Sequence, residues 1–402
     1  MTDFLAIQKV CEANSYLLEK AFDEFLMYYA ADVAGLEKYM NKRMKPYRKI
    51  IRRRMKDYEG LLKAQFIATM VFKEGGVLRK LLKHTRVQAL TPEELSFLEF
   101  QLEHPWRYSF ARIEEELGHD FFRMLDTITG ETYLLYSPGI TRTIHDDGKA
   151  VSLWMLLIIF NGRCYQTQGI IASFTSFTPS DMLFLATELQ PDITEDVQVY
   201  EIVERNPFPF MALLQYSDFP LMLYKGDMSI FHLADDDMAT FSPDVFGNDA
   251  LIQWKENVYS IWIPELSDSA HMVRVYYDES AELLMRMSFT RTGWDLTREW
   301  LAKYGISVKE EPDFTVSPTM AAAVKEITGY EAEINPYERL FEPPVTEEDE
   351  QHDEEMERAL DIIIPKLNAG DPIDFEQIAR ESNMDVKDIQ IIVDLVRKEM
   401  GK

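Results

Sequence analysis

Residues 151–175 read VSLWMLLIIFNGRCYQTQGIIASFT. Eight apolar side chains follow one another from Leu153 to Phe160, and Asn161-Gly162 then separates them from a second, loosely alternating run. Because both residues of an Asn-Gly pair tolerate positive φ at little cost, the pattern predicts a β-hairpin. A strand without a polar face has to be covered on both sides, so the rest of the chain is expected to pack over each face of this hairpin.

The composition is that of a globular protein with a strong acidic bias. The chain has 402 residues, of which 46% are hydrophobic, and its net charge is -27. This length suits two or three domains, and the charge disfavours nucleic acid and anionic membranes as general partners. No apolar run approaches the roughly 20 residues that span a bilayer, and the N-terminus lacks the apolar segment of a signal peptide. We therefore expect a soluble, cytoplasmic protein without a membrane partner.

The first hundred residues show helical periodicity. Apolar side chains recur there at spacings of three and four, and Thr91-Pro92 with Glu94 forms a capping-box pattern. From Tyr108 to about Ala172 close turn signals predict a meander of antiparallel strands instead. These signals are Thr129-Gly130, Pro138-Gly139, Asp147-Gly148 and Asn161-Gly162. Thr178 is then the expected N-cap of a helix that runs through Leu189.

The segment 207–290 is again strand-like, and its prolines suit strand ends. The expected strands are Met211 to Tyr216, Leu221 to Tyr224, Met228 to Leu233, Val258 to Ile263, Met272 to Tyr277 and Leu283 to Phe289. A helix follows from Trp294 to Tyr304, and its two tryptophans do not share one face, which leaves one for exposure to a partner. Ser173-Phe174-Thr175 and Ser288-Phe289-Thr290 each link a strand to a helix, a weak sign of two related halves.

The predicted class is therefore α+β. Residues 1–104 form a helical N-terminal region, and residues 105–330 form a β-rich core with covering helices and two candidate halves. Residues 331–351 carry three prolines and an acidic run, which is typical of a linker. Residues 352–402 form a small, separate helical module.

One family resemblance starts from the sequence FRMLDTITGE at residues 122–131. This turn, the strands after it and the helix at Pro179 resemble the β-rich domain of some bacterial proteins that carry a SEC-C zinc motif. The resemblance covers about residues 108–190 and implies a bacterial protein. Because the chain has no terminal Cys/His cluster, the resemblance implies neither the zinc nor an activity.

The C-terminal module resembles a helix-turn-helix in the stretch FEQIARESNMDVKDIQIIVDLV, which begins at Phe375. Ile378 and Ala379 fall in the first helix and Met384 at the turn, with the small Ala379 at the contact between the helices. Ile389 and Ile392 fall on the buried side of the second helix, and Asn383 takes the position where glycine is usual, since it too can adopt a left-handed conformation. The would-be recognition helix carries Asp385, Asp388 and Asp394 against Lys387, Arg397 and Lys398. Carboxylates repel phosphates, so insertion into a DNA groove is poorly supported.

A basic stretch between residues 42 and 56 is the candidate binding site, because it contains nine cations and no acid. The nine cations are Lys42, Arg43, Lys45, Arg48, Lys49, Arg52, Arg53, Arg54 and Lys56. One interpretation is a patch for phosphate or nucleic acid. The other is a helix face that docks on acidic protein surface, for example on residues 347–357, where eight of eleven residues are acids.

Candidates for catalysis or metal binding are few. His232 with Asp235-Asp236-Asp237, and His145 with Asp146-Asp147, have residue types that bind metals, but they lie in turn-like sequence where Asp is favoured anyway. Cys11 and Cys164 are far apart in sequence and support neither a disulfide framework nor a zinc site. No Walker, G-x-G-x-x-G, G-x-S-x-G or H-E-x-x-H motif occurs. We therefore expect no cofactor and no metal.

The leading hypothesis for function is a non-catalytic binding or assembly protein, because two segregated charge blocks and a small detachable domain occur without a reaction motif. Its partner is then another protein or a second copy of the chain. The first alternative is a transcription regulator that uses residues 352–402. The second alternative is an enzyme of unknown class.

Overall fold

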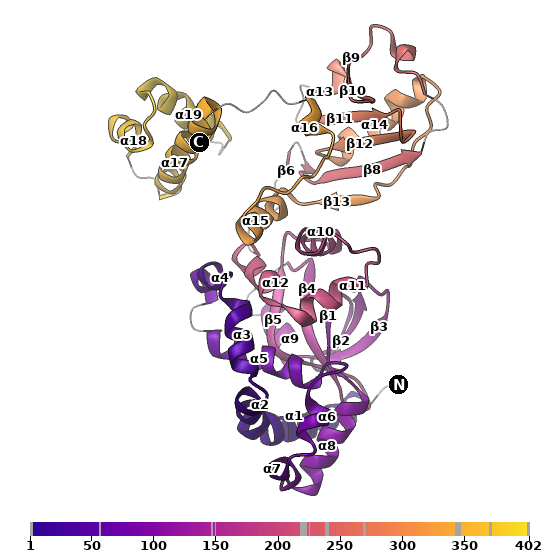
Figure 1. Ribbon diagram of the computed structural model, residues 1–402, viewed down its shortest axis with the longest axis vertical. Coiled ribbons are helices and arrows are strands. Elements are labelled where there is room, and N and C mark those ends of the chain that lie inside the picture. The colour runs from indigo at the N-terminus through magenta and orange to yellow at the C-terminus, as the bar shows by residue number, and fades with distance from the viewer. Residues whose placement is uncertain are drawn as a thin grey trace. The chain divides into compact units, whose positions relative to one another are not determined.

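The structure is a computed structural model. It describes residues 3–55, 58–145, 148, 150–217, 223–224, 226–237, 241–267, 271–341, 347–369 and 372–399. Helices form the N-terminal region, a β-rich region follows, and helices form the C-terminal part, which confirms the predicted α+β class (Figure 1). Residues 1–336 make one compact unit and residues 337–402 a second. Each unit is described by itself.

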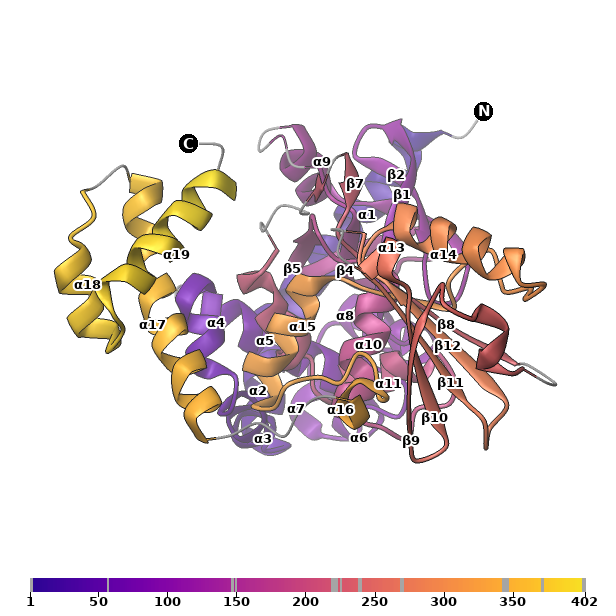
Figure 2. The same ribbon diagram turned by 90° about the horizontal axis from the view of Figure 1, so that it is seen from above.

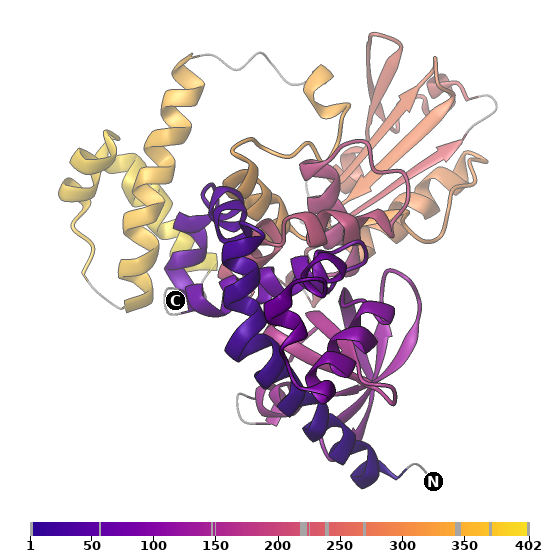
Figure 3. The same ribbon diagram turned by 60° about the horizontal axis from the view of Figure 1, so that its bottom comes forward.

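The N-terminal region is helical, as its periodicity predicts. Its elements are α1 (Phe4–Leu18), the π-helical segment η1 (Glu19–Leu26), α2 (Met27–Val33), α3 (Leu36–Met44), α4 (Arg48–Met55), α5 (Glu59–Phe72), α6 (Leu78–Leu81), α7 (Thr85–Gln88) and α8 (Pro92–Glu103). Thr91 and Glu94 form the predicted capping box at the start of α8. Figure 3 shows these indigo and violet helices along one side of the β-rich part.

The first β region is a closed barrel. It consists of β1 (Arg107–Gly118), β2 (Phe121–Asp126), β3 (Thr132–Tyr136), β5 (Tyr165–Phe174) and β4 (Leu153–Phe160), in this order around the barrel. Strands β4 and β5 form the predicted antiparallel hairpin at Asn161-Gly162, with Phe160 opposite Tyr165. The prediction that all neighbouring strands are antiparallel is wrong for one strand pair, because β3 and β5 pair in parallel to close the barrel.

A helix between β3 and β4 explains this parallel pair. Pro138-Gly139 was expected to form a strand turn, but α9 (Pro138–His145) begins there. Ser137 Oγ accepts a hydrogen bond from Ile140 N at 3.3 Å, and Pro138 takes the first helical position. After this helix, β4 pairs with β1 and β5 instead of with β3, and β5 is the strand that lies beside β3 and runs parallel to it.

Strand β4 is buried on both faces, as its sequence requires. Trp154, Leu156 and Ile158 lie in the barrel interior with residues such as Phe122 and Leu135. On the other face Leu153, Met155, Leu157 and Ile159 are at most 1% exposed. The inner face is thus covered by the barrel itself, and the outer face by surrounding helices.

Helix α5 approaches the barrel closely at a bulge in β5. The Gln65 side chain accepts a hydrogen bond from Ile170 N at 2.8 Å, and both groups are buried. Gly169 beside it has φ +75°, and a Cβ there would lie 2.8 Å from Gln65 Oε1. Only a glycine therefore permits both the left-handed backbone and the close approach.

Residues 179–216 add helices to the barrel. They are α10 (Pro179–Leu189), α11 (Gln198–Arg205), α12 (Phe208–Ala212) and the 3₁₀ turn η3 (Leu213–Gln215). Thr178 caps α10 as predicted. The predicted strand from Met211 to Tyr216 is wrong, because a short buried apolar run has no periodicity that separates a strand from a helix. Pro207 and Pro209 fit the start of α12.

The second β region is an open antiparallel sheet in the order β13-β8-β12-β11-β10-β9. Its strands are β8 (Phe231–Asp237), β9 (Leu251–Lys255), β10 (Val258–Trp262), β11 (Val273–Asp278), β12 (Leu283–Ser288) and β13 (Phe314–Val316), beside the short hairpin β6 (Leu223–Tyr224) and β7 (Asp227–Met228). The 3₁₀ turn η4 (Pro243–Phe246), α13 (Pro264–Ser267), α14 (Arg291–Lys303) and α15 (Pro318–Thr328) complete the region. Residues 221–222 of the predicted strand from Leu221 to Tyr224 lie outside the described residues.

Helix α14 runs along one face of this sheet (Figure 2). Both of its tryptophans are buried, so the expectation of an exposed one is wrong: Trp300 joins the apolar core, and Trp294 stacks on a buried arginine. This arginine, Arg286, is fully buried on β12 and donates from Nε to Asp236 on β8 at 2.8 Å. Its Nη2 also donates to Lys309 O at 2.9 Å.

The C-terminal unit contains α16 (Glu338–Phe341), α17 (Glu347–Ala369), α18 (Phe375–Ser382) and α19 (Val386–Glu399). Ile363, Ile378, Ala379 and Ile389 belong to a small apolar core that the last three helices share. Asn383 has φ +61° after α18, the left-handed conformation expected of it. Helix α17 begins within the range predicted as linker.

The Gly169 contact predicts a steric penalty that a matched glycine does not share. Gly169→Ala should lower the free energy of unfolding by about 2 kcal/mol or more, from left-handed strain plus the clash with Gln65. Gly130→Ala has the same sign of φ but nothing within 4 Å of its Cβ, so it should cost only about 1 kcal/mol. Urea denaturation of both variants checks this, and equal costs would contradict the close approach.

The buried ion pair predicts strong coupling between two residues. Asp236→Asn or Arg286→Met alone should each cost about 3–5 kcal/mol, because either leaves an uncompensated buried partner. The double variant should cost clearly less than the sum. Arg52→Met, which loses only an exposed pair with Glu59, is the control and should change stability by about 1 kcal/mol or less. Additive costs in the double-mutant cycle would contradict the pairing.

Candidate functional site

The described part of the predicted basic stretch covers the end of α3, the turn after it and α4. Leu36, Met40 and Met44 of α3, with Ile50 and Ile51 of α4, point into the protein and are at most 6% exposed. This apolar spacing leaves the cations between them on the outer side. Lys42, Lys45, Lys49, Arg52 and Arg53 are exposed, whereas Arg43 and Arg48 are partly buried. We call the five exposed cations the basic surface.

Two of these five cations have acidic partners. Arg52 Nη2 lies 2.9 Å from Glu59 Oε2, and Arg53 Nη1 lies 2.6 Å from Glu326 Oε1 on α15. The partly buried Arg48 also approaches Glu59, at 3.6 Å. Exposed pairs of this kind contribute at most about 1 kcal/mol each, so a stronger acidic ligand can replace them.

The three lysines are different. Among the residues that the structure describes, the side chains of Lys42, Lys45 and Lys49 have no hydrogen-bond or ionic partner. Arg43 is held by Tyr39 instead, through a 3.2 Å hydrogen bond and its ring face. The side chain of Arg54 and all of Lys56 lie outside the described residues. The basic surface therefore presents positive charge that its own unit only partly neutralises.

The scaffold under the basic surface is fixed by packing. Helix α4 lies against η3 and α12, and Tyr47 at the turn is partly buried, which raises its pKa. Glu326 accepts a hydrogen bond from Tyr216 and pairs with Arg53. The cations are thus displayed by a rigid support, which lowers the entropy cost of binding.

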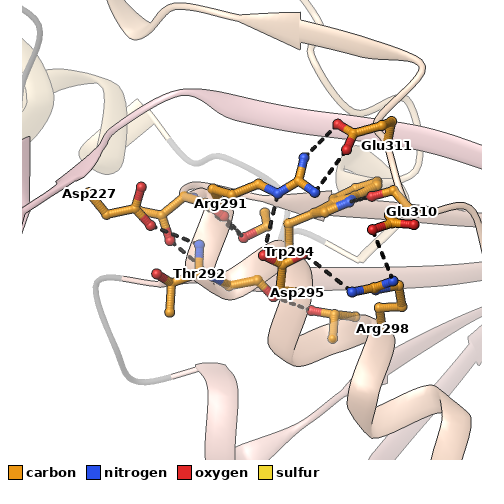
Figure 4. A network of polar contacts seen from close by, with 12 residues as sticks. Asp227, Arg291, Thr292, Trp294, Asp295, Arg298, Glu310 and Glu311 are labelled. Atoms are coloured by element: carbon orange, nitrogen blue, oxygen red, sulfur yellow. Dashed lines mark hydrogen bonds and ion pairs between the residues drawn. The ribbon is translucent and has the colours of Figure 1, made fainter.

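A second charged cluster, on α14, shows the opposite arrangement (Figure 4). Arg291 contacts both carboxylate oxygens of Glu311 at 2.6 and 3.1 Å, and Arg298 lies 3.8 Å from both Asp295 and Glu310. Trp294 Nε1 donates to Glu310 O at 2.7 Å. Each of these arginines has a carboxylate partner, so we interpret the cluster as a clamp that holds residues 310–311 over α14.

The turn in the sequence that suggested the SEC-C resemblance is held by a buried carboxylate. Asp126 is fully buried, and its Oδ1 accepts from Ile128 N, Thr129 N and the Tyr200 hydroxyl at 2.7–3.1 Å. Its Oδ2 accepts from Ser109 Oγ at 2.8 Å and from Arg107 at 3.2 Å. All these donors are internal, so Asp126 serves the fold rather than a ligand.

The predicted metal candidates do not converge. His232 and Asp236 lie on one face of β8, where Asp236 pairs with Arg286, and Asp235 and Asp237 alternate to the other face. His145 contacts Glu116, while Asp146 and Asp147 lie outside the described residues. In the described part of the chain, no three His, Cys, Asp or Glu side chains gather as metal ligands would. No helix among those residues is long and apolar enough to cross a membrane.

The C-terminal unit is acidic around its turn. Residues 337–402 contain 19 acids and 8 bases. A hollow of about 860 Å³ at the α18–α19 turn is lined by Glu355, Glu376, Asp385 and Asp388 with one cation, Arg380. This potential repels phosphates, so the helix-turn-helix-like geometry lacks the charge that DNA binding uses.

Asp181 connects the start of α10 to the start of α15, the helix that carries Glu326. Its Oδ2 accepts from Thr178 N at 2.7 Å in the capping box of α10, and its Oδ1 accepts from Ser317 N at 2.7 Å before α15. Burial raises the pKa of Asp181 to about 6, although these hydrogen bonds oppose the shift. The carboxylate thus helps to hold one edge of the basic surface, at the expense of burying a charge.

Comparison with known proteins adds no assignment. No protein-family model matches the chain, and no curated protein or solved structure shows significant similarity to it. The resemblance of residues 108–190 to the SEC-C-associated domain and that of residues 352–402 to a helix-turn-helix therefore stay predictions. Function has to be inferred from the surface itself.

The raised pKa of Asp181 predicts a pH dependence of stability with a defined sign. The ordinary pKa is 3.8 and the folded one about 6, so between these values the folded state binds more protons than the unfolded state. Lowering the pH through this window should therefore stabilise the wild type relative to Asp181→Asn, by on the order of 2 kcal/mol. Denaturation of both proteins at about pH 7 and about pH 4.5 measures the difference. Parallel pH profiles would contradict the shift.

Proposed function

We propose that the protein is a non-catalytic binding and assembly protein whose basic surface docks an acidic segment of a partner protein. The observation that carries this proposal is the set of three exposed lysines, Lys42, Lys45 and Lys49, without acidic partners in the described residues, on a rigid helix pair. The two arginines of the α14 cluster, Arg291 and Arg298, have carboxylate partners, whereas these three lysines do not.

A protein partner is favoured over nucleic acid by the surroundings of the basic surface. Glu59 and Glu326 sit among the cations, and the whole chain carries a net charge of -27. The closely spaced phosphates of a duplex would be repelled by these carboxylates. The acidic side chains of a protein segment can instead contact the cations while avoiding Glu59 and Glu326. Residues 347–357 have the required chemistry, so a second copy of the chain is the partner that we test first.

The transcription-regulator alternative draws support only from the geometry of α18 and α19, and their charge argues against it. For the enzyme alternative, the described residues offer no group of three metal-ligating side chains, and the polar groups that converge on Asp126 bond to one another. Neither alternative is proposed.

A titration can test the proposal directly. A fluorescent peptide of residues 345–359 is titrated with a chain that lacks residues 345–402, which frees the basic surface from competition. Binding is expected at about 50 mM salt and should weaken at least tenfold at about 300 mM, because screening removes most exposed charge attraction. Lys42→Glu, Lys45→Glu and Lys49→Glu together should abolish it.

The matched control is the triple variant Lys80→Glu, Lys83→Glu and Lys303→Glu, which changes the net charge equally at exposed lysines elsewhere. It should bind the peptide as the parent does. Peptide binding that survives the Lys42, Lys45 and Lys49 reversals, or no binding at low salt, would refute the proposed surface. A mobility shift of duplex DNA by the full chain would favour the regulator instead.

Assembly is tested by light scattering on the full chain and on the chain without residues 345–402. The full chain should form a dimer or larger species at low salt, and the deletion should be monomeric. A strictly monomeric full chain whose deleted form still binds the peptide would mean that the acidic segment docks within its own chain, which would exclude assembly by this route.

A further inference from the structure

The two cysteines, which are remote in sequence, meet in the fold. Cys11 lies on α1 and Cys164 in the turn between β4 and β5, and their Sγ atoms are 3.5 Å apart. Both are free thiols, and their side chains are at most 2% exposed. A disulfide has an S–S bond of about 2.0 Å, so the sulfurs need to approach by about 1.5 Å to bond.

Polar groups around the sulfurs distinguish this pair from cysteines that merely fill a core. Asn161 Nδ2 lies 3.3 Å from Cys11 Sγ and 3.6 Å from Cys164 Sγ, and donates to both. The Asn161 Oδ1 atom accepts from Cys164 N at 2.9 Å, which fixes the amide with its donor side toward the sulfurs. Gln166 binds Asn161 and the Cys11 carbonyl in turn.

These contacts make the two thiols unequal. The hydrogen bond from Cys164, together with that from Asn161, lowers the pKa of Cys11 against the effect of its burial. The same hydrogen bond and burial raise the pKa of Cys164. Asn161 Nδ2 also lies closer to Cys11 Sγ than to Cys164 Sγ, at 3.3 against 3.6 Å. Cys11 is therefore the sulfur with more thiolate character, which is the nucleophilic form of cysteine.

A surface hollow reaches Asn161, the residue that contacts both sulfurs. A hollow of about 480 Å³ on the surface is lined by Asn14, Phe97, Phe100 and Asn161, among others. Asn161 thus lies between this hollow and the sulfurs. A molecule the size of hydrogen peroxide that enters the hollow meets the amide that contacts Cys11.

We propose that Cys11 and Cys164 form a reversible disulfide when the protein meets a peroxide, which ties α1 to the β4–β5 turn. The Cys11 thiolate attacks one peroxide oxygen, the O–O bond breaks, and the hydroxide that leaves takes up the thiol proton as water. The resulting Cys11 sulfenic acid is attacked by Cys164, the S–O bond breaks, and a second water leaves with the Cys164 proton. Two thiols and one hydrogen peroxide give one disulfide and two waters, and a dithiol reductant reverses the oxidation.

The bond would have a structural effect in addition to its chemistry. It closes a loop between residues 153 positions apart, so it restricts the unfolded chain strongly. Because Asn14 of α1 and Asn161 of the turn both line the hollow, drawing α1 toward the turn also narrows the hollow. This inference does not depend on the proposed acidic partner.

The test uses the folded full chain with hydrogen peroxide, followed by denaturation, thiol alkylation and intact mass measurement. Wild type should lose both alkylatable thiols and two hydrogen atoms without gaining oxygen, remain the same oligomer, and recover both thiols with dithiothreitol. Its unfolding temperature should rise after oxidation and return on reduction. Folded protein that keeps both thiols after treatment, while chemically denatured protein oxidises, would overturn the proposal.

Single variants test the order of the two steps. Cys164→Ser should stop at a Cys11 sulfenic acid, detected as a dimedone adduct, because the resolving thiol is gone. No adduct at Cys11, or an adduct only at Cys164 in the Cys11→Ser variant, would overturn the assignment of Cys11 as the attacking sulfur. The wild-type measurement stands by itself if either variant folds poorly.

Asn161 is a positioning residue in this scheme. Asn161→Asp keeps the oxygen that accepts from Cys164 N but removes the donor to the sulfurs, so its oxidation rate should fall and its pH profile should move to higher pH. Asn14→Asp is the matched control, because Asn14 donates to Gln166 and not to a sulfur. Equal profiles for Asn161→Asp and wild type would show that Asn161 does not activate Cys11.

Discussion

The fold depends on the need to bury strand β4 on both faces. Seven of its eight residues are almost completely buried, and an unpaired apolar surface of that size would be unfavourable in water. The barrel closes over one face of β4, and helices that precede and follow the barrel in the sequence cover the other face. That covering brings α5 so close to β5 that Gln65 replaces a ladder partner at Ile170 and excludes any side chain at position 169.

Charged side chains are paired with opposite charges where they are buried or hold a segment in place. Where cations are buried or clamp a segment, as Arg286 and Arg291 do, a carboxylate stands opposite each of them. The basic surface is different, because Lys42, Lys45 and Lys49 are exposed, have no described acid partner and lie close together in sequence on one helix pair. The net charge of the chain is -27, so a positively charged surface runs against its overall charge. Buried apolar residues of the same two helices hold this surface in place. A binding role fits the unmatched surface better than the matched cluster.

Local signals predicted the elements that they specify directly. Thr91 and Thr178 cap helices because a hydroxyl before a proline-led apolar run can satisfy free backbone N–H groups. Asn161-Gly162 turns the hairpin, and Asn383 takes its left-handed conformation. Prediction failed where an apolar run was too short to show a period: Met211 to Tyr216 is helical. It failed also at Pro138, where Ser137 before the proline was a cap signal that turn propensity concealed.

The candidate site could also be predicted only in part. The sequence by itself determined that cations cluster between residues 42 and 56 and that acids cluster near residue 350. It also determined that β4 must be enclosed. These features can be read from neighbouring residues along the chain, because each depends only on the charge or hydrophobicity of a continuous segment. Only the tertiary structure decided which cations find partners, that Asp236 faces Arg286, and that Cys11 meets Cys164. Such pairs join residues tens to more than a hundred positions apart, and their contact depends on how the barrel closes and how helices dock on it, which no local pattern encodes.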